Sequence, residues 1–458
     1  MEQKTEHKKN GNGTKNIHND PPFVSRKFLF VSWESLSGDL AWSIKKEGHQ
    51  VKAYIQANSD QDVYDGFLEK VPDWKKYIDW ADVIVFDDIG FGRIADQLRA
   101  KGKLVVGGST YTDKLEEDRE FGQVEMKNAG LSILPHWEFE SFDAAIKFIS
   151  ENPGRYVFKP SGNTASGQKG ILFLGQEDDG RDLIEIMEQN KKAWAKKIKK
   201  FQLQKMAVGV EVAVGAFFNG KDFVYPINVN FEHKKLFPGD IGPYTGEMGT
   251  LNYFSPANQL FHSTLEKLKP QIAQSGYVGY IDINCIANAK GIYPLEFTCR
   301  FGYPFISIQM EGIVSPLGDF FYRLAAGQNI ELKTKKGFQI GVCVVVPPFP
   351  FDDIKESFIY KDLSILFKKP NLEGIHLGDV KMINGVWAVA GKTGYVLVVT
   401  GSGLTIEEAR HQAYSRIKNV TLQNMYYRTD IGERWQLGDS DRLHHWGYLS
   451  NGLPPDHK

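Results

Sequence analysis

The chain has 458 residues, more than one ordinary hydrophobic core serves, so two to four domains are expected. Its composition is that of a globular protein, and its formal net charge of −1 provides no overall attraction to nucleic acid or to an anionic membrane. Three scattered cysteines without CxxC spacing argue against a disulfide framework or a zinc site and favour a cytoplasmic location.

The first 23 residues are polar and rich in Lys, Asn and Gly, which predicts a disordered tail. They lack the apolar core of a signal peptide, and no run is long and apolar enough to span a bilayer. Residues 24–110 then alternate apolar strands with helices, which predicts a small parallel α/β domain. Its expected strands are 27–32, 51–55, 82–86 and 104–106, and its expected helices are 38–46 and 94–101.

Residues 111–330 form the next expected unit, divided into lobes at residues 205 and 206. The first lobe is expected to hold helices at 113–129, 142–151 and 181–200 and strands at 156–159 and 201–205. The second is expected to hold strands at 210–218 and 222–225, a loop at 239–249, a helix at 261–275 and a hairpin of strands 278–287 and 291–297.

Residues 331–436 are expected to form a separate small α+β unit, with strands at 340–346, 385–390 and 394–400. Residues 437–458 are expected to be a tail. The closing helix, 405–417, begins with the capping-box pattern TIEE.

The loop 160–170 is rich in Gly and Ser, with glycines at Gly162 and Gly167 among others. Lys159 precedes it at the end of a strand, and Lys169 stands near its end. Backbone N–H groups and a lysine charge suit the oxygens of a polyphosphate. The residues after the loop are strand-like, so this is not a P-loop, and on these residues alone an ordinary surface loop is as good an interpretation.

An extended segment ending in Lys205, Met206 and Ala207 is followed by a lone acid, Glu211, on the next strand. Such a segment could receive an adenine on its backbone and a ribose on the acid. On these residues alone, an exposed strand carboxylate is the simpler interpretation.

Two acids, Asp282 and Glu296, lie within otherwise apolar strands of the predicted hairpin. A carboxylate among apolar residues needs a partner or a cation, and two such acids beside phosphate oxygens would form a hard oxygen site suited to Mg²⁺. Alternation places Glu296, Thr298 and Arg300 on one face of the strand. The alternative is a buried acid that pairs with Arg300.

A basic cluster with an acid, Glu232, His233 and Lys234, precedes a glycine-rich loop that contains Thr245 and Gly246. Together they could close over an anionic substrate. Spacing alone does not distinguish this site from an ordinary surface loop.

Taken together, these stretches resemble the ATP-grasp superfamily, and more narrowly the phosphoribosylamine–glycine ligase family. That family has a loop of the type DHKR…GDxGPNTGGMG followed by EFNCRFGDPE, and this chain has FEHKKLFPGDIGPYTGEMG and EFTCRFGYPF. The segments VLVVTGSGLTIEEARHQAYSRI and YYRTDIGERW also match the family's C-terminal domain. The resemblance runs from about residue 107 to residue 435.

The resemblance implies a pre-ATP-grasp domain, a two-lobed ATP-grasp fold and a small C-terminal α+β domain. It implies that ATP is bound by Arg119 (where the family usually has Lys), Lys159, Gly162, Gly167, Lys169, Lys205, Met206, Ala207 and Glu211. It implies that Mg²⁺ or Mn²⁺ is held by Asp282, Glu296 and Thr298, that Arg300 and Lys159 are catalytic, and that substrate meets Glu232, His233, Lys234, Thr245 and Gly246.

The chain departs from the family at positions that concern the metal and the substrate. Thr298 replaces an Asn, and Tyr303 and Phe305 replace acids. The family's N-terminal phosphate-binding stretch GxGGREHA is replaced by SWESLSGDLA, and GPEAPL is replaced by FDDIGFG. We therefore expect an altered amine acceptor.

The expected activity is that of an ATP-dependent carboxylate–amine ligase that forms an amide through an acyl phosphate, and its nearest named role lies in purine biosynthesis. The expected partners are a small carboxylate, glycine or another amino acid, and an amine; nucleic acid and membrane are not expected. The chain would be a monomer or a homodimer. The alternative hypothesis is a non-catalytic nucleotide-binding relative with a regulatory role.

Overall fold

The computed structural model describes residues 23–161, 172–351 and 359–449. It has mixed α/β architecture, with one parallel sheet and several antiparallel sheets. Among the described residues, no helix combines the length and the apolar character needed to cross a membrane. Cys285, Cys299 and Cys343 are buried free thiols, in keeping with their positions in apolar runs of the sequence.

The N-terminal unit is a five-stranded parallel sheet, as the alternation of strands and helices predicted. Its strand order is β3-β2-β1-β4-β5, so the direction in which the chain adds strands reverses between β1 and β4. Its elements are β1 (Lys27–Ser32), α1 (Gly38–Lys46), β2 (Gln50–Ile55), η1 (Asn58–Asp60), β3 (Glu69–Lys70), η2 (Trp74–Tyr77), β4 (Val83–Phe86), α2 (Gly92–Ala100) and β5 (Val105–Val106).

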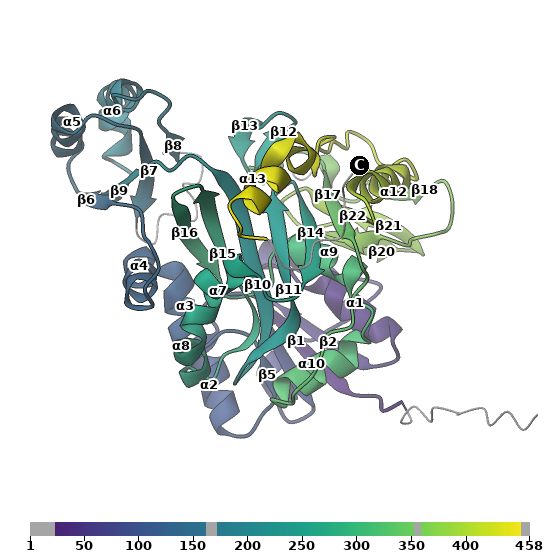
Figure 1. Ribbon diagram of the computed structural model, residues 1–458. Coiled ribbons are helices and arrows are strands. Elements are labelled where there is room, and N and C mark those ends of the chain that lie inside the picture. The colour runs from purple at the N-terminus through teal and green to yellow at the C-terminus, as the bar shows by residue number, and fades with distance from the viewer. Residues whose placement is uncertain (1–22, 162–171, 352–358, 450–458) are drawn as a thin grey trace, which may run out of the picture.

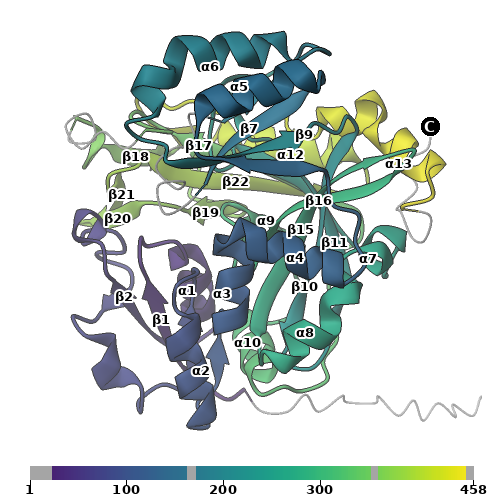
Figure 2. The same ribbon diagram turned by 90° about the vertical axis from the view of Figure 1, so that its left-hand side faces the viewer.

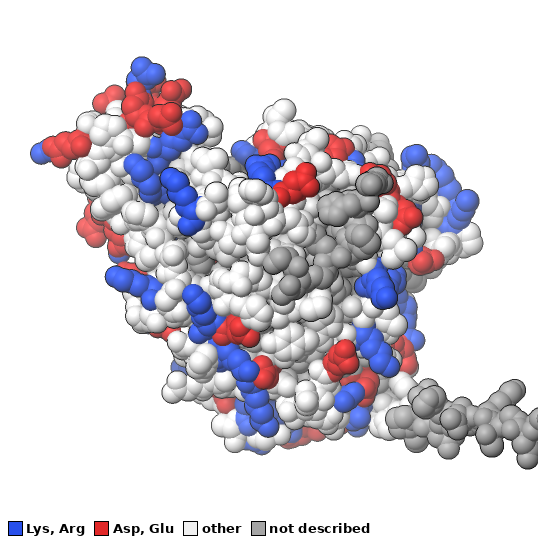
Figure 3. Space-filling model, viewed as in Figure 1, with Lys and Arg blue, Asp and Glu red and all other residues white. Residues whose placement is uncertain are grey.

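A second unit is a small antiparallel sheet that projects from the rest of the molecule (Figure 1). Its strands, in spatial order, are β6 (His136–Phe139), β9 (Lys200–Lys205), β7 (Tyr156–Ser161) and β8 (Phe173–Leu174). Helices α5 (Phe142–Glu151) and α6 (Arg181–Trp194) lie together over one face, where Phe158, Phe201 and Leu183 form a separate core. Charged side chains crowd the outer end of this lobe (Figure 3).

The largest element is an eight-stranded antiparallel sheet. Its strands, in spatial order, are β16 (Gly291–Thr298), β15 (Val278–Asn288), β10 (Val210–Asn219), β11 (Phe223–Glu232), β14 (Gly249–Ser255), β17 (Phe338–Val345), β22 (Tyr395–Gly403) and β19 (Ile375–Leu377). The predicted hairpin of β15 and β16 is confirmed. The expected boundary at residue 330 falls between strands of this sheet, because β14 pairs directly with β17.

The C-terminal residues also form elements of their own. A four-stranded sheet consists of β20 (Val380–Ile383), β21 (Val386–Val389), β18 (Ser364–Phe367) and β23 (Val420–Thr421). Helix α12 (Ile406–Ile417) begins at Thr405 with the predicted capping box to Glu408. The expected tail is partly structured, since η5 (Trp435–Asp439) is followed by α13 (Ser440–His445), whose Leu443 is buried. Helices α9 (Phe305–Gly312) and α10 (Leu317–Ala325) join the large sheet to the N-terminal unit.

Two predicted helices are divided by local chemistry, and one predicted loop is partly a strand. The helix expected at 113–129 is two helices, α3 (Thr110–Glu117) and α4 (Arg119–Asn128), because Asp118 is extended and its side chain caps the second helix. The helix expected at 261–275 breaks at the non-helical Thr264 into α7 (Gln259–Ser263), η4 (Leu265–Leu268) and α8 (Lys269–Gln274). The loop expected at 239–249 contributes one strand to a small hairpin, β12 (Lys235–Phe237) and β13 (Ile241–Tyr244).

Candidate functional site

One face of the large sheet gathers polar side chains from neighbouring strands. In the register of β15 and β16, Asp282 lies opposite Thr298 and Asn284 lies opposite Glu296. Residues paired across a ladder, and those two apart on a strand, point to the same side. Asp282, Asn284, Glu296 and Thr298 therefore share one face, which confirms that part of the predicted alternation.

Lys234 lies at the centre of the predicted acids on this face. Its Nζ is 3.4 Å from Glu211 Oε1 of β10, 3.3 Å from Glu232 Oε2 of β11 and 3.3 Å from Glu296 Oε1 of β16. Burial acts to lower the pKa of Lys234, but Glu232, Glu296 and Glu211 together raise it well above its ordinary value. Lys234 in turn lowers the pKa of Glu296 to about 2. The lysine stays charged and holds three strands together at this point.

Asp282 is the most deeply buried acid of the cluster. It is 2% exposed, and its Oδ1 has no hydrogen-bond partner among the residues that the structure describes. Burial and the charge of Glu232 raise the pKa of Asp282 to about 8, against the opposing effect of hydrogen bonds from Thr298 and Tyr280. The predicted alternative, in which one of these two buried acids pairs with Arg300, is not formed, because the partners of Arg300 are Asp88 and Glu116.

These oxygens fit a hard divalent cation in part. Asp282 offers an oxygen without a partner, and Thr298 and Asn284 offer neutral oxygens on the same face. Oxygen donors of this kind suit Mg²⁺, which commonly completes its shell with phosphate oxygens and water. Within the described ranges, no three His, Cys, Asp or Glu side chains group as a metal site by themselves. The face therefore fits a cation that is held jointly with a phosphorylated ligand.

Two cations, one from the small lobe and one from α4, act on this face. Lys159 on β7 donates to Gln204 Oε1 at 2.7 Å, and Arg119 at the start of α4 donates to the carbonyl oxygen of Pro160 at 3.3 Å. Burial and the neighbouring Arg119 lower the pKa of Lys159 to about 8, while Glu296 and Glu211 act in the opposite direction. Lys159 of the small lobe and Arg119 of α4 thus lie within electrostatic reach of Glu296 on the large sheet.

The predicted adenine segment joins the two lobes. The Lys205 ammonium lies 4.6 Å from the centre of the Tyr156 ring, and the Met206 N–H donates to the carbonyl oxygen of Arg155 at 3.0 Å. Ala207 is half-buried just before β10 begins at Val210. The segment runs directly from β9 into the strand that carries Glu211.

Arg300 lies just beyond β16, which ends at Thr298. Its Nε is 3.0 Å from Glu116 Oε1 of α3 and 3.0 Å from Asp88 Oδ1, which follows β4 of the N-terminal sheet. These two acids raise the pKa of Arg300 although burial acts to lower it. The guanidinium is therefore fixed where the N-terminal unit meets the large sheet.

The predicted substrate residues divide into two groups. Glu232 and Lys234 belong to the ion-pair cluster, and the Thr245 hydroxyl donates to the carbonyl oxygen of Lys234 at 2.9 Å, which ties the hairpin of β12 and β13 to it. His233 takes no part in the ion pairs of the cluster; it is 1% exposed and lies near Arg428 and Arg434. A Cβ added at Gly246 would meet no other atom within 4 Å. Gly162, Gly167 and Lys169 lie outside the described residues.

Several residues of the site have no distinctive signal in the sequence. Asn284 donates to Glu232 Oε1 at 3.4 Å, Gln204 holds Lys159, and Glu116 and Asp88 hold Arg300. Asn284 follows Asp282 by two residues, so strand alternation could have found it. The others depend on contacts between distant elements.

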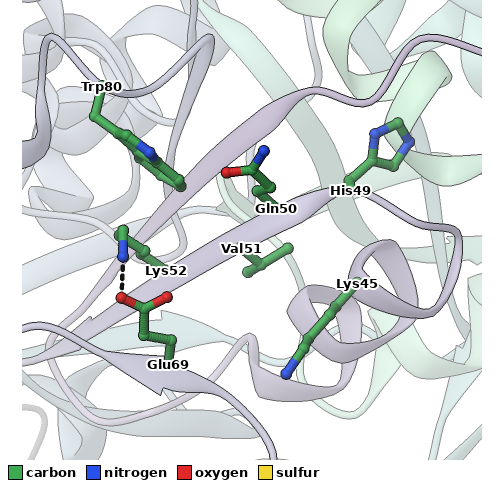
Figure 4. A pocket seen from close by; sticks show the side chains of 7 residues that line it. All are labelled: Lys45, His49, Gln50, Val51, Lys52, Glu69 and Trp80. Atoms are coloured by element: carbon green, nitrogen blue, oxygen red, sulfur yellow. Dashed lines mark hydrogen bonds and ion pairs between the residues drawn. The ribbon is translucent and has the colours of Figure 1, made fainter.

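A shallow pocket elsewhere does not belong to this site. Figure 4 shows it on the N-terminal sheet, beside β2. Its lining residues are Lys45, His49, Gln50, Val51, Lys52, Glu69 and Trp80. None of them is a predicted site residue, and Lys52 is paired with Glu69.

Comparisons with known proteins agree with this arrangement. The phosphoribosylglycinamide synthetase ATP-grasp (A) domain family matches residues 117–305, and the phosphoribosylglycinamide synthetase C domain family matches residues 340–434. A relative from Helicobacter pylori (strain J99) named phosphoribosylamine–glycine ligase is 28% identical over 354 residues, covering 74% of this chain and 78% of the relative. One of the same name from Neisseria meningitidis is 25% identical over 359 residues, covering 74% and 81%.

Solved structures share the fold. The crystal structure of phosphoribosylamine–glycine ligase from Thermotoga maritima aligns with a TM-score of 0.69 at 21% identity, covering 89% of this chain and 100% of that chain. Biotin carboxylase from Campylobacter jejuni in complex with β-γ-ATP aligns with a TM-score of 0.59 at 12% identity, covering 93% and 97%. The two lobes, the matched domains and these likenesses lead to one conclusion: the chain is an ATP-grasp protein that resembles phosphoribosylamine–glycine ligase.

Proposed function

We propose that this protein is an ATP-dependent ligase that joins a small carboxylic acid to an amine and releases ADP and phosphate. The observation that carries the proposal is the position of two cations, Lys159 of the small lobe and Arg119 of α4, within electrostatic reach of the Glu296 carboxylate on the large sheet. Cations opposite an acidic, oxygen-rich face provide what a metal-bound nucleotide triphosphate requires. Glycine is the proposed carboxylate, because curated relatives are named phosphoribosylamine–glycine ligase.

The proposed reaction has two steps. A carboxylate oxygen of the acid attacks the γ-phosphorus of ATP, so that a P–O bond forms and the bond to the bridging oxygen of ADP breaks. The amine nitrogen then attacks the acyl carbon, the amide C–N bond forms, and phosphate leaves. Such chemistry is accelerated by positioning and charge neutralisation rather than by a protein nucleophile.

The residues of the site have distinct proposed roles. Lys159 and Arg119 bind the phosphate oxygens, and Arg300, held by Glu116 and Asp88, stabilises the charge that develops during transfer. The segment 205–207 receives the adenine, and Glu211 binds the ribose. Magnesium, when bound, would be held by Asp282, Glu296 and Thr298 and would neutralise the charge of the phosphates.

Acyl-phosphate trapping tests the proposal without knowledge of the natural amine. The protein is incubated with ATP, Mg²⁺, glycine and hydroxylamine, which converts an acyl phosphate into a hydroxamate. We expect hydroxamate and ADP to form together and to depend on the carboxylate. If no carboxylate in an amino-acid panel yields hydroxamate, the proposal is wrong.

A second candidate function is that of a nucleotide-binding protein without ligase activity. It is favoured by Lys234, whose ammonium already occupies the carboxylates of Glu211 and Glu296. Tight ATP binding without hydroxamate formation would support this second function, whereas turnover would exclude it.

A further inference from the structure

A row of three residues crosses the large sheet on the face that carries the proposed metal ligands. Asp282 of β15 lies directly opposite Gly215 of β10, and Gly215 lies directly opposite Asn228 of β11. Figure 2 shows these three strands side by side, with α9 close to them. Residues opposite one another in a ladder share one face, so the side chains of Asp282 and Asn228 flank a glycine that has none.

The Tyr280 hydroxyl lies over Gly215. Tyr280 precedes Asp282 by two residues on β15, so both side chains project from the same face. A Cβ added at Gly215 would lie 2.2 Å from Tyr280 Oη and 2.6 Å from Asp282 Cβ. A glycine is therefore required for the hydroxyl to lie between Asp282 and Asn228, and the hydroxyl is hydrogen-bonded to both.

These hydrogen bonds run in one direction. Gln309 of α9 donates from Nε2 to Asn228 Oδ1 at 3.4 Å, which leaves the amide nitrogen of Asn228 facing the tyrosine. Asn228 Nδ2 then donates to Tyr280 Oη at 3.1 Å. Because an amide nitrogen can only donate, the single proton of the tyrosine hydroxyl is left for the Asp282 carboxylate, which accepts it. We call Gln309, Asn228 and Tyr280 the Tyr280 relay.

The Tyr280 relay is enclosed by protein and ends at an acid with one unsatisfied oxygen. Tyr280 and Gln309 are 0% exposed and Asn228 is 1% exposed. Asp282 Oδ1 has no partner in the described part of the chain, so the hydrogen bonds that Asp282 accepts fall on its other oxygen. A carboxylate held by one oxygen keeps a fixed orientation and leaves the other oxygen free to bind a cation. Hydrogen bonds from outer residues orient metal-binding carboxylates in this way.

We propose that Tyr280, oriented by Asn228 and Gln309, is a positioning residue that holds Asp282 so that its unpartnered oxygen is available to the divalent cation of the nucleotide complex. The inference rests on the proposed ligase function, because it concerns the magnesium site proposed there. Tyr280 acts only through Asp282. A network that merely satisfied its own polar groups would stabilise the fold without affecting cation binding.

Removal of one hydroxyl tests the inference. Tyr280→Phe keeps the ring and deletes Oη. We measure Mn²⁺ binding to the equimolar complex of the full chain with ADP, as loss of the free-ion electron paramagnetic resonance signal, with ADP alone as the blank. We expect Mn²⁺ to bind about tenfold more weakly to the variant, which is the usual size of an outer hydrogen-bond effect.

Tyr253→Phe is the matched control. Tyr253 lies on β14 of the same sheet and is 1% exposed, and its Oη has no hydrogen-bond partner among the residues that the structure describes. Loss of this hydroxyl should leave the Mn²⁺ affinity unchanged. Melting temperatures show whether each variant is folded.

Asn228→Leu tests the direction of the relay. Leucine is close to asparagine in size but cannot donate to Tyr280, so Mn²⁺ should bind more weakly, by a smaller factor than in Tyr280→Phe. In the Tyr280→Phe background the same substitution should cause no further loss, because Asn228 acts through the hydroxyl. An unchanged Mn²⁺ affinity in folded Tyr280→Phe, or an effect of Asn228→Leu that persists without the hydroxyl, would overturn the inference. If Tyr280→Phe does not fold, the affinity of Asn228→Leu alone decides.

The hydroxamate assay separates failure of this inference from failure of the proposed function. Tyr280→Phe should need about tenfold more Mg²⁺ for its half-maximal rate, with a kcat at saturating Mg²⁺ close to that of the natural protein. If the natural protein forms hydroxamate and both proteins need the same Mg²⁺ concentration, the positioning role is wrong and the ligase function stands. If the natural protein forms none, the ligase function fails, and Mn²⁺ binding decides the role of Tyr280.

Discussion

Removal of the Lys234 ammonium is expected to destabilise the protein by about 3 kcal/mol. The side chains of Lys234 and Glu232 are 24% and 14% exposed, so this ion pair is partly buried. The free-energy cost of breaking it therefore lies between the values for exposed pairs, about 0–1 kcal/mol, and for buried pairs, about 3–5 kcal/mol. Glu211 and Glu296 are more exposed and together add about 1 kcal/mol. Lys234→Met keeps the length of the side chain and leaves the three carboxylates to repel one another.

Urea unfolding at pH 7.5 measures this loss. Lys290→Met, at a lysine on the exposed turn between β15 and β16, is the matched control and should lie within about 0.5 kcal/mol of the natural protein. A double-mutant cycle with Glu232→Gln should give a coupling of about 1–2 kcal/mol. Mg²⁺ should raise the melting temperature of Lys234→Met more than that of the natural protein, because a cation can replace the ammonium. A Lys234→Met stability equal to that of the control would refute this account.

Three further outcomes are expected. Glu296→Gln should abolish hydroxamate formation while the fold persists, because it removes one of the carboxylates proposed to hold magnesium; retained turnover would contradict that role. Thr298→Asn should keep or raise turnover, since an amide oxygen reaches farther than a hydroxyl, and a dead variant would show that the interpretation of this position is wrong. Burial lowers the pKa of His233 to about 3. Below about pH 6.5 the histidine is therefore protonated in the unfolded chain but stays neutral in the folded protein. The free energy of unfolding should fall by about 2 kcal/mol between pH 7.5 and 5. His233→Phe should remove that slope in urea titrations, whereas His262→Gln, at a half-exposed histidine, should keep it.

Features that depend on neighbours along the chain could be predicted from the amino-acid sequence. The hairpin of β15 and β16 follows from two apolar runs around a short polar turn, and the start of α12 at Thr405 follows from a capping box. The parallel unit follows from its alternation of strands and helices. The shared face of Asp282, Glu296 and Thr298 was also predictable, because strand periodicity acts over two residues.

The contacts between groups far apart in the sequence could not be predicted and are known from the folded chain. The pairing of β14 with β17 carries the large sheet into the C-terminal unit, and no local pattern encodes which strand edges pair. Arg300 is held by Glu116 and Asp88, which lie far from it in sequence, and Lys234 meets carboxylates from three strands. Long-range contacts depend on sheet order and register, and burial then sets the pKa of each group, so these properties arise only when the chain is folded.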